Sequence, residues 1–165
     1  MPLVETLLPE FDHEMTLTRK VLERVPDDRL DWKPHAKSYA VGPLAQHLAT
    51  IPMWGTMTLS EVQVDLASLP PNAPLHTRRD ILALFDGHVA SARAALVGKS
   101  DAEFKAQWSL KRDGHVIFSM PKQAVWRSFV ISHLIHHRAQ LGVYLRLLDV
   151  PVPSTYGPSA DEGGL

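Results

Sequence analysis

The stretch SHLIHHRAQLGVYL, residues 132–145, places three histidines within five positions of a segment that otherwise has the apolar spacing of a helix. With His133 as the reference on a helix of 3.6 residues per turn, His137 lies about 40° away, and Gln140 and Tyr144 lie about 20° to either side. This polar stripe borders an apolar stripe made of Val130, Leu134, Leu141 and Leu148. The polar side chains are therefore expected to face the protein interior, where they need partners.

Histidines four residues apart lie on adjacent turns of one helix face, so His133 and His137 can point at a single metal ion. His136 lies about 60° away on the other side and is less well directed for sharing a site with His137. A third ligand must come from another segment, and both His47 and His88 qualify. Each shares a helix face with apolar residues: Leu44, Ile51 and Trp54 beside His47, and Ile81, Phe85 and Ala92 beside His88. The spacing does not choose between them.

A lone inward histidine is also typical of a hydrogen-bonded core, which is the competing interpretation for each of these residues. The other four histidines, His13, His35, His76 and His115, are interpreted as surface or loop residues without chemistry.

Around this stretch, the pattern predicts four helices over about residues 2–25, 41–64, 77–98 and 122–148. Thr77 can cap the third helix, with Asp80 three residues on. Between 103 and 120, an Asp113-Gly114 pair separates stretches rich in aromatic and β-branched residues, which indicates a short hairpin. The segment VPVPSTYGPSADEGGL at 150–165 cannot continue a helix and is expected to lie over the others as a tail. We therefore predict an all-α four-helix bundle with a hairpin-like insertion before the last helix, in one domain over 1–165.

The composition restricts the chemistry and the partners. The 165 residues are 45% hydrophobic and carry a formal charge of −1, so no basic surface for nucleic acid or for an anionic membrane is expected. The N-terminus is acidic where a signal peptide is basic, and no apolar run of about 18 residues is present, which favours a cytoplasmic protein. Cysteine is absent, so a metal must be held by nitrogen and oxygen ligands.

Two blocks of the sequence, LAQHLATIPMW and HLIHHRAQLGVYLRLLDVPVPSTYGPSADE, closely resemble the DinB/YfiT-like superfamily of metal-binding four-helix bundles. The second block is the specific one, since it matches the family pattern H-x-x-x-H-x-x-Q and the VP-x-x-YGPSADE tail from His133 through Glu162. LDWKPHAKSYAVGPLAQHL and DGHVIFSMPK also look like family segments, so the resemblance covers most of residues 27–162.

This resemblance implies an up-down-down-up bundle with a metal site at His47, His133 and His137, which favours His47 over His88. It also implies a homodimer and a connection with stress responses. Relatives of known activity include transferases of low-molecular-weight thiols such as bacillithiol and mycothiol, whereas others act on different small molecules.

Three neutral imidazoles leave an open position on a bound ion, as in catalytic rather than structural sites. A water or thiol bound there would lose its proton near neutral pH and become a nucleophile. Zinc or nickel is the expected ion, and iron or manganese also fits. Gln140, Tyr144 and Arg138 are candidates to orient ligands or substrate. The leading hypothesis is thus a metal-dependent thiol transferase acting on a small electrophile; the alternatives are a metal-dependent hydrolase and a non-catalytic metal- or ligand-binding protein.

Overall fold

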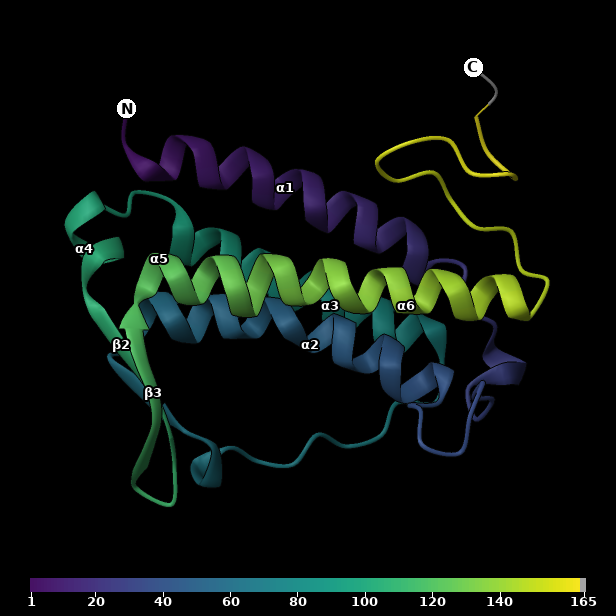
Figure 1. Cartoon of the computed structure of the whole chain (residues 1–165), viewed down its shortest axis with the longest axis horizontal. Coiled ribbons are helices and arrows are strands. Elements are labelled where there is room, and N and C mark those ends of the chain that lie inside the picture. The colour runs from purple at the N-terminus through teal and green to yellow at the C-terminus, as the bar shows by residue number, and fades with distance from the viewer. Residues whose placement is uncertain (164–165) are drawn as a thin grey trace.

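The computed structural model describes residues 1–163, most of which form long helices packed side by side (Figure 1). The long elements are α1 (Leu3–Leu22), α2 (Val41–Ser60), α3 (Arg78–Leu96) and a continuous segment made of α5 (Lys122–Val125), η3 (Trp126–Ser132) and α6 (His133–Leu147). Both α1 and α2 pack against α3 and α6. Figure 1 shows α1 and the α5–η3–α6 segment running in one direction, and α2 and α3 running in the other. None of the helices in this described part of the chain combines the length and apolar character that a membrane span requires.

The core between these helices is apolar and closely packed. Side chains with no exposed surface come from every long helix: Phe11, Leu44, Leu48, Ile51, Ile81, Trp126, Leu134 and Leu141. The rings of Phe11 and Trp126 lie 5.3 Å apart between α1 and η3. The apolar stripe predicted for the last helix therefore faces the core, and this burial fixes how the helix is rotated about its axis.

The predicted helix ends are confirmed where a local signal marks them. The Thr77 side chain accepts a hydrogen bond from the backbone N–H of Asp80 at the start of α3. Gly98, just beyond α3, has a φ of 77°, a conformation that glycine adopts without strain. In contrast, α1 ends at Leu22 rather than near residue 25, and α2 ends at Ser60 rather than near residue 64.

The all-α prediction is wrong in one respect, because the structure contains a three-stranded sheet. The predicted hairpin is present as β2 (Gln107–Arg112) and β3 (His115–Pro121), and both Asp113 and Gly114 have positive φ angles, as its tight turn requires. The strand that was not predicted, β1 (Gln63–Asp65), pairs in parallel with β2. A helix was expected there, but Val64 gains burial against the hairpin, and the Asp65 carboxylate accepts hydrogen bonds from the backbone N–H groups of Asp113 and Gly114.

Several short elements were also not predicted. They are the helix α4 (Asp101–Lys105), capped by Ser100, and the 3₁₀ turns η1 (Asp27–Arg29) and η2 (Leu66–Ser68). The η3 segment has π-helical hydrogen bonding: the backbone N–H of His133 reaches the carbonyl of Ser128, five residues earlier. Wide turns of this kind occur frequently at functional sites. Here the wide turn immediately precedes the histidines of α6.

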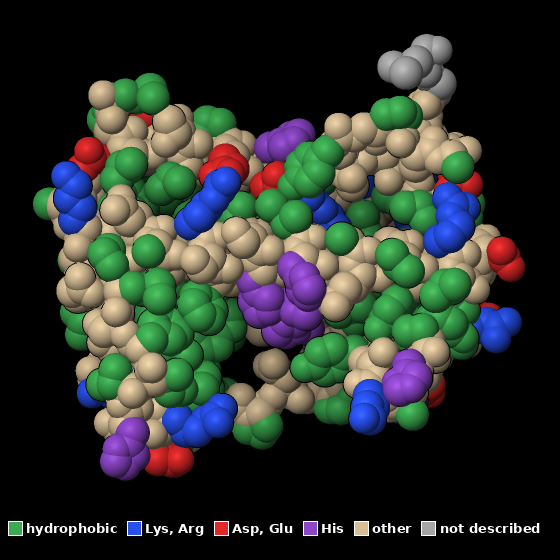
Figure 2. Space-filling view, viewed as in Figure 1, with side chains coloured by type: hydrophobic (Ala, Val, Ile, Leu, Met, Phe, Trp, Pro, Cys, Tyr) green, Lys and Arg blue, Asp and Glu red, His purple; other side chains and the backbone are tan. Residues whose placement is uncertain are grey.

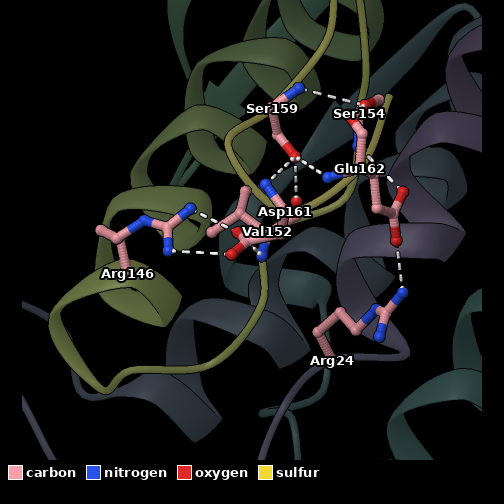
Figure 3. Close-up of polar contacts among 7 residues, drawn as sticks. All are labelled: Arg24, Arg146, Val152, Ser154, Ser159, Asp161 and Glu162. Atoms are coloured by element: carbon pink, nitrogen blue, oxygen red, sulfur yellow. Dashed lines mark hydrogen bonds and ion pairs between the residues drawn. The ribbon is translucent and has the colours of Figure 1, made fainter. Parts of the chain in front are cut away.

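Residues 150–163 of the tail lie over the helices, as expected, and polar contacts hold them there (Figure 3); residues 164–165 lie outside the described residues. Glu162 forms an ion pair with Arg24, two residues beyond α1, and Asp161 pairs with Arg146 of α6. Asp161 also accepts a hydrogen bond from the backbone N–H of Val152, at 2.8 Å. The tail therefore joins the ends of α1 and α6.

Candidate metal site

The structure brings together three histidines from two helices. His47 lies on α2, and His133 and His137 lie one turn apart on α6. Nε2 of His133 lies 3.2 Å from Nε2 of His47 and 2.9 Å from Nε2 of His137. One ligand nitrogen from each histidine can be chosen so that all three lie within 4.8 Å of one another. The three side chains are half-buried, and Figure 2 shows histidines gathered at the middle of one face, beside hydrophobic side chains and a hollow.

Burial keeps these histidines neutral. It lowers the pKa of His47 from 6.5 to about 4, with further lowering from the neighbouring His137 and His133. Burial is also the main reason why the pKa values of His133 and His137 are lowered. Neutral imidazoles have the free electron pair that a metal needs, so the group is ready to bind a cation near pH 7 without losing protons.

The donor set fits a divalent metal ion. Two nitrogens bound tetrahedrally about 2.0 to 2.1 Å from one zinc ion would lie about 3.4 Å apart, close to the distances between the Nε2 atoms here. All three donors are imidazole nitrogens, which suit zinc, nickel, copper and iron. The ligand set could therefore hold an ion and leave a coordination position open.

Neighbouring groups orient two of these rings. Nδ1 of His137 lies 2.7 Å from the side-chain oxygen of Gln140, so Gln140 contacts one of the three rings. His133 forms a hydrogen bond with the backbone of Phe129, which opposes the lowering of its pKa. Such contacts to the second ring nitrogen set the tautomer and direct the first nitrogen at the metal. The Tyr39 ring, which the sequence analysis did not single out, stacks on the His47 ring at a centroid distance of 6.2 Å.

The two rival histidines lie outside this group. Nδ1 of His88 contacts the backbone carbonyl of Ala49 at 2.9 Å, so His88 is a hydrogen-bonded histidine between α3 and α2. The exposed ring of His136 lies 4.8 Å from the ring of His137, but His136 is not in the cluster of potential ligands. The choice of His47 over His88 therefore follows from how the helices are placed.

Arg138 does not face the histidines, and the suggestion that it meets a substrate at this site is wrong. It is 3% exposed and forms a 2.8 Å ion pair with Glu14 of α1. Tyr156 of the tail donates a hydrogen bond to Glu14, and the Tyr156 ring lies over the Arg138 guanidinium.

The Tyr144 ring packs edge-on against the Trp32 ring at a centroid distance of 5.8 Å, which places Tyr144 in a hydrophobic contact. Gln140 is thus the candidate supporting residue that touches one of the three histidines.

These features define a predominantly helical protein with a three-histidine group that can hold a metal ion. The sequence model of the DinB family matches residues 1–163, and the chain belongs to this family. The Bacillus subtilis protein named "Uncharacterized protein YrdA" is 24% identical over 163 residues, which span 96% of this chain and 91% of that protein.

Two solved structures have the same fold. The crystal structure of the DinB-like protein YjoA from Bacillus subtilis has a TM-score of 0.71 at 15% identity, over 92% of this chain and 99% of that one. A DinB-like protein from Bacillus cereus has a TM-score of 0.70 at 19% identity, over 94% and 98% of the two chains. At these identities the likeness concerns the fold.

Proposed function

We propose that His47, His133 and His137 bind one divalent metal ion, zinc or nickel, in an up-down-down-up four-helix bundle, and that the protein is a metal-dependent thiol transferase. The observation that carries this proposal is the convergence of three neutral imidazole nitrogens from α2 and α6. A bound ion would lower the pKa of a thiol or water at its open position. The reaction then needs a small thiol as a substrate, because the chain contains no cysteine.

A thiol suits this site better than water as the nucleophile. A thiol bound to the ion would lose its proton outright, whereas metal-bound water has a pKa of about 7 and would be only partly ionised at neutral pH. Hydrolytic sites commonly add a carboxylate as a general base, but the cluster contains histidines alone among the described residues. The thiol proton passes to solvent, the sulfur forms a bond to an electrophilic carbon, and the leaving group departs with the electron pair of the broken bond.

Metal analysis of the full-length protein purified without chelator tests the binding step. We expect about one ion per chain, as a single three-histidine site requires, lost in His47→Ala, His133→Ala and His137→Ala. His136→Ala is the matched control, because it removes a neighbouring imidazole of the same helix and should keep the metal. Wild-type protein that cannot be loaded with zinc, nickel or manganese would contradict the proposal.

The catalytic step needs a separate assay. Loaded protein is mixed with 1-chloro-2,4-dinitrobenzene and several low-molecular-weight thiols, including bacillithiol and N-acetylcysteine, and thiol consumption is followed with time. We expect consumption above the uncatalysed rate in wild type and in His136→Ala, but not in His137→Ala. Equal rates in wild type and His137→Ala would indicate a non-catalytic metal-binding protein. Turnover of esters or amides without added thiol would instead indicate a hydrolase.

A further inference from the structure

An apolar cavity of about 210 Å³ lies directly beside two of the three histidines, His47 and His133. Its other walls come from α2, the turn η2, the sheet and the last helical segment, and include Trp54, Leu66, Trp108, Leu110, Phe118 and Phe129. Figure 2 shows the corresponding arrangement on the surface, where hydrophobic side chains adjoin the histidines at a hollow. A molecule in this cavity would therefore contact both the apolar walls and the proposed metal site.

Aromatic rings form much of the wall. The rings of Phe118 on β3 and Phe129 on η3 stack at a centroid distance of 4.8 Å, and Trp108 on β2 lies 6.0 Å from Phe118. Trp108 is 1% exposed, so its position is set by packing rather than by solvent. Aromatic walls of this kind favour a flat ring through stacked or edge-to-face contacts.

Charged side chains are missing from the cavity lining in the part of the chain that the structure describes. An ionised group held against the apolar walls, away from the histidines, would lose its hydration without gaining a partner of opposite charge. An uncharged apolar group would instead gain by leaving water. The wall therefore selects for neutral ligands.

We infer that this cavity binds an uncharged aromatic portion of the substrate and holds it beside His47 and His133. The inference rests on the proposed function for its chemical meaning, since the atom to be attacked would then lie at the histidine end of the cavity. The volume suits one ring with a few attached atoms, because an apolar cavity of about 150 Å³ already accommodates benzene. The substrate class is thus a small neutral aromatic electrophile.

Binding can be tested without metal or turnover. Full-length, metal-free protein with ¹³C-labelled methyl groups is titrated with toluene and, separately, with benzoate, which adds a negative charge to a similar ring. We expect toluene to shift the methyl signals of Leu66, Leu110 and Val125, which line the cavity. Val21 and Val152 line a different cavity, between α1, α6 and the tail, and their signals should stay in place.

A matched pair of variants locates the binding site. Leu66→Trp narrows the cavity and should weaken toluene binding by about tenfold, because the larger indole takes up part of the volume that the ring would occupy. Leu69→Trp is the control. Like Leu66, Leu69 is half-buried against the apolar side chains around Trp108, but it does not line the cavity. If Leu66→Trp does not fold, the smaller change Leu66→Phe and the methyl shifts of the wild type decide.

The inference is overturned if toluene leaves the three cavity methyl signals unchanged, if benzoate binds equally well, or if Leu69→Trp weakens binding as much as Leu66→Trp. Metal content measured on the same preparation separates this result from the proposed function. Zinc uptake without toluene binding removes the aromatic pocket and leaves the metal enzyme. Toluene binding in a protein that takes up no metal removes the enzyme and leaves a ligand cavity.

Discussion

Nδ1 of His137 lies 2.7 Å from the side-chain oxygen of Gln140, the residue almost one turn further along α6. A ring nitrogen that faces an amide oxygen carries the proton, so this contact leaves the electron pair on Nε2. Nε2 is also the atom that lies 2.9 Å from the ring of His133. Gln140 therefore leaves the unprotonated nitrogen of His137 facing the other two histidines.

The first prediction concerns this contact. Gln140→Leu removes the acceptor and should weaken zinc affinity by about 10- to 100-fold, the usual effect of losing a group that orients a ligand histidine. Gln140→Glu keeps an acceptor oxygen at the same place and should stay much closer to wild type. Competition with a chromogenic chelator measures both affinities. Equal affinity in Gln140→Leu and wild type would show that the contact does not orient His137.

The second prediction concerns the stability of the metal-free protein at different pH values. Folding lowers the pKa of His47 from 6.5 to about 4, so between these values the unfolded chain binds more protons than the folded chain. The free energy of unfolding should therefore fall as the pH falls from about 6.5 toward 4, because protons favour the state that binds them more tightly. His133 and His137 shift in the same direction and add to the effect.

Urea unfolding in the presence of EDTA, repeated at several pH values in this window, checks the slope. His47→Gln removes one of the titrating groups and should make the dependence on pH shallower. His115→Gln, at the exposed start of β3, is the control and should keep the wild-type slope. A stability that rises on acidification would contradict the burial of these rings.

The third prediction compares two helical glycines. A Cβ atom at Gly55 would lie 2.8 Å from Cζ3 of Trp126, a side chain with no exposed surface, whereas a Cβ atom at Gly87 would meet nothing within 4 Å. Gly55→Ala should destabilise the protein by about 1 to 3 kcal/mol through overpacking. Gly87→Ala should stabilise it by about 0.5 to 1 kcal/mol, because glycine loses more backbone freedom in a helix. Thermal unfolding of both variants gives the sign, and the same sign for both would contradict the close approach of α2 to η3.

The fourth prediction concerns the buried ion pair between Glu14 and Arg138, whose side chains are 7% and 3% exposed. Arg138→Met leaves a buried carboxylate without its partner and should lower the free energy of unfolding by about 3 to 5 kcal/mol. Arg93→Met is the matched control, because Arg93 pairs with Asp12 of the same helix α1 at an exposed position. Its loss should change stability by at most about 1 kcal/mol.

Urea unfolding at neutral pH compares the two variants. A loss in Arg138→Met no larger than that in Arg93→Met would show that Glu14 finds another partner when Arg138 is removed. Tyr156 is the nearest candidate, since its hydroxyl group already donates to the Glu14 carboxylate.

The sequence predicted the parts of this protein that depend on near neighbours in the chain. The four long helical segments follow from apolar periodicity, the start of α3 from Thr77 and Asp80, and the hairpin from Asp113-Gly114. Each signal lies within a few residues, where backbone preference and side-chain spacing decide the structure. The pairing of His133 with His137 belongs to the same group, because one turn of helix fixes it.

Contacts between segments that are distant in the sequence were not predicted. The strand β1 forms because β2, more than forty residues further on, offers it a partner, and strand preference of this kind depends strongly on such context. The π-helical hydrogen bonds of η3 have no counterpart in the 3.6-residue period that predicted a regular helix there. Arg138 was a candidate to orient a substrate, but it forms an ion pair with Glu14 of the distant helix α1.

By itself, then, the sequence determined the helical segments, the i, i+4 histidine pair and the absence of a cysteine ligand. The resemblance to a known family favoured His47 over His88, but the residues alone left both open, because each lies on an apolar helix face. Only the tertiary structure placed His47 beside His133 and turned His88 to the Ala49 carbonyl. The physical reason is that periodicity gives a side chain's angle about its own helix, whereas packing decides which helix that side chain meets.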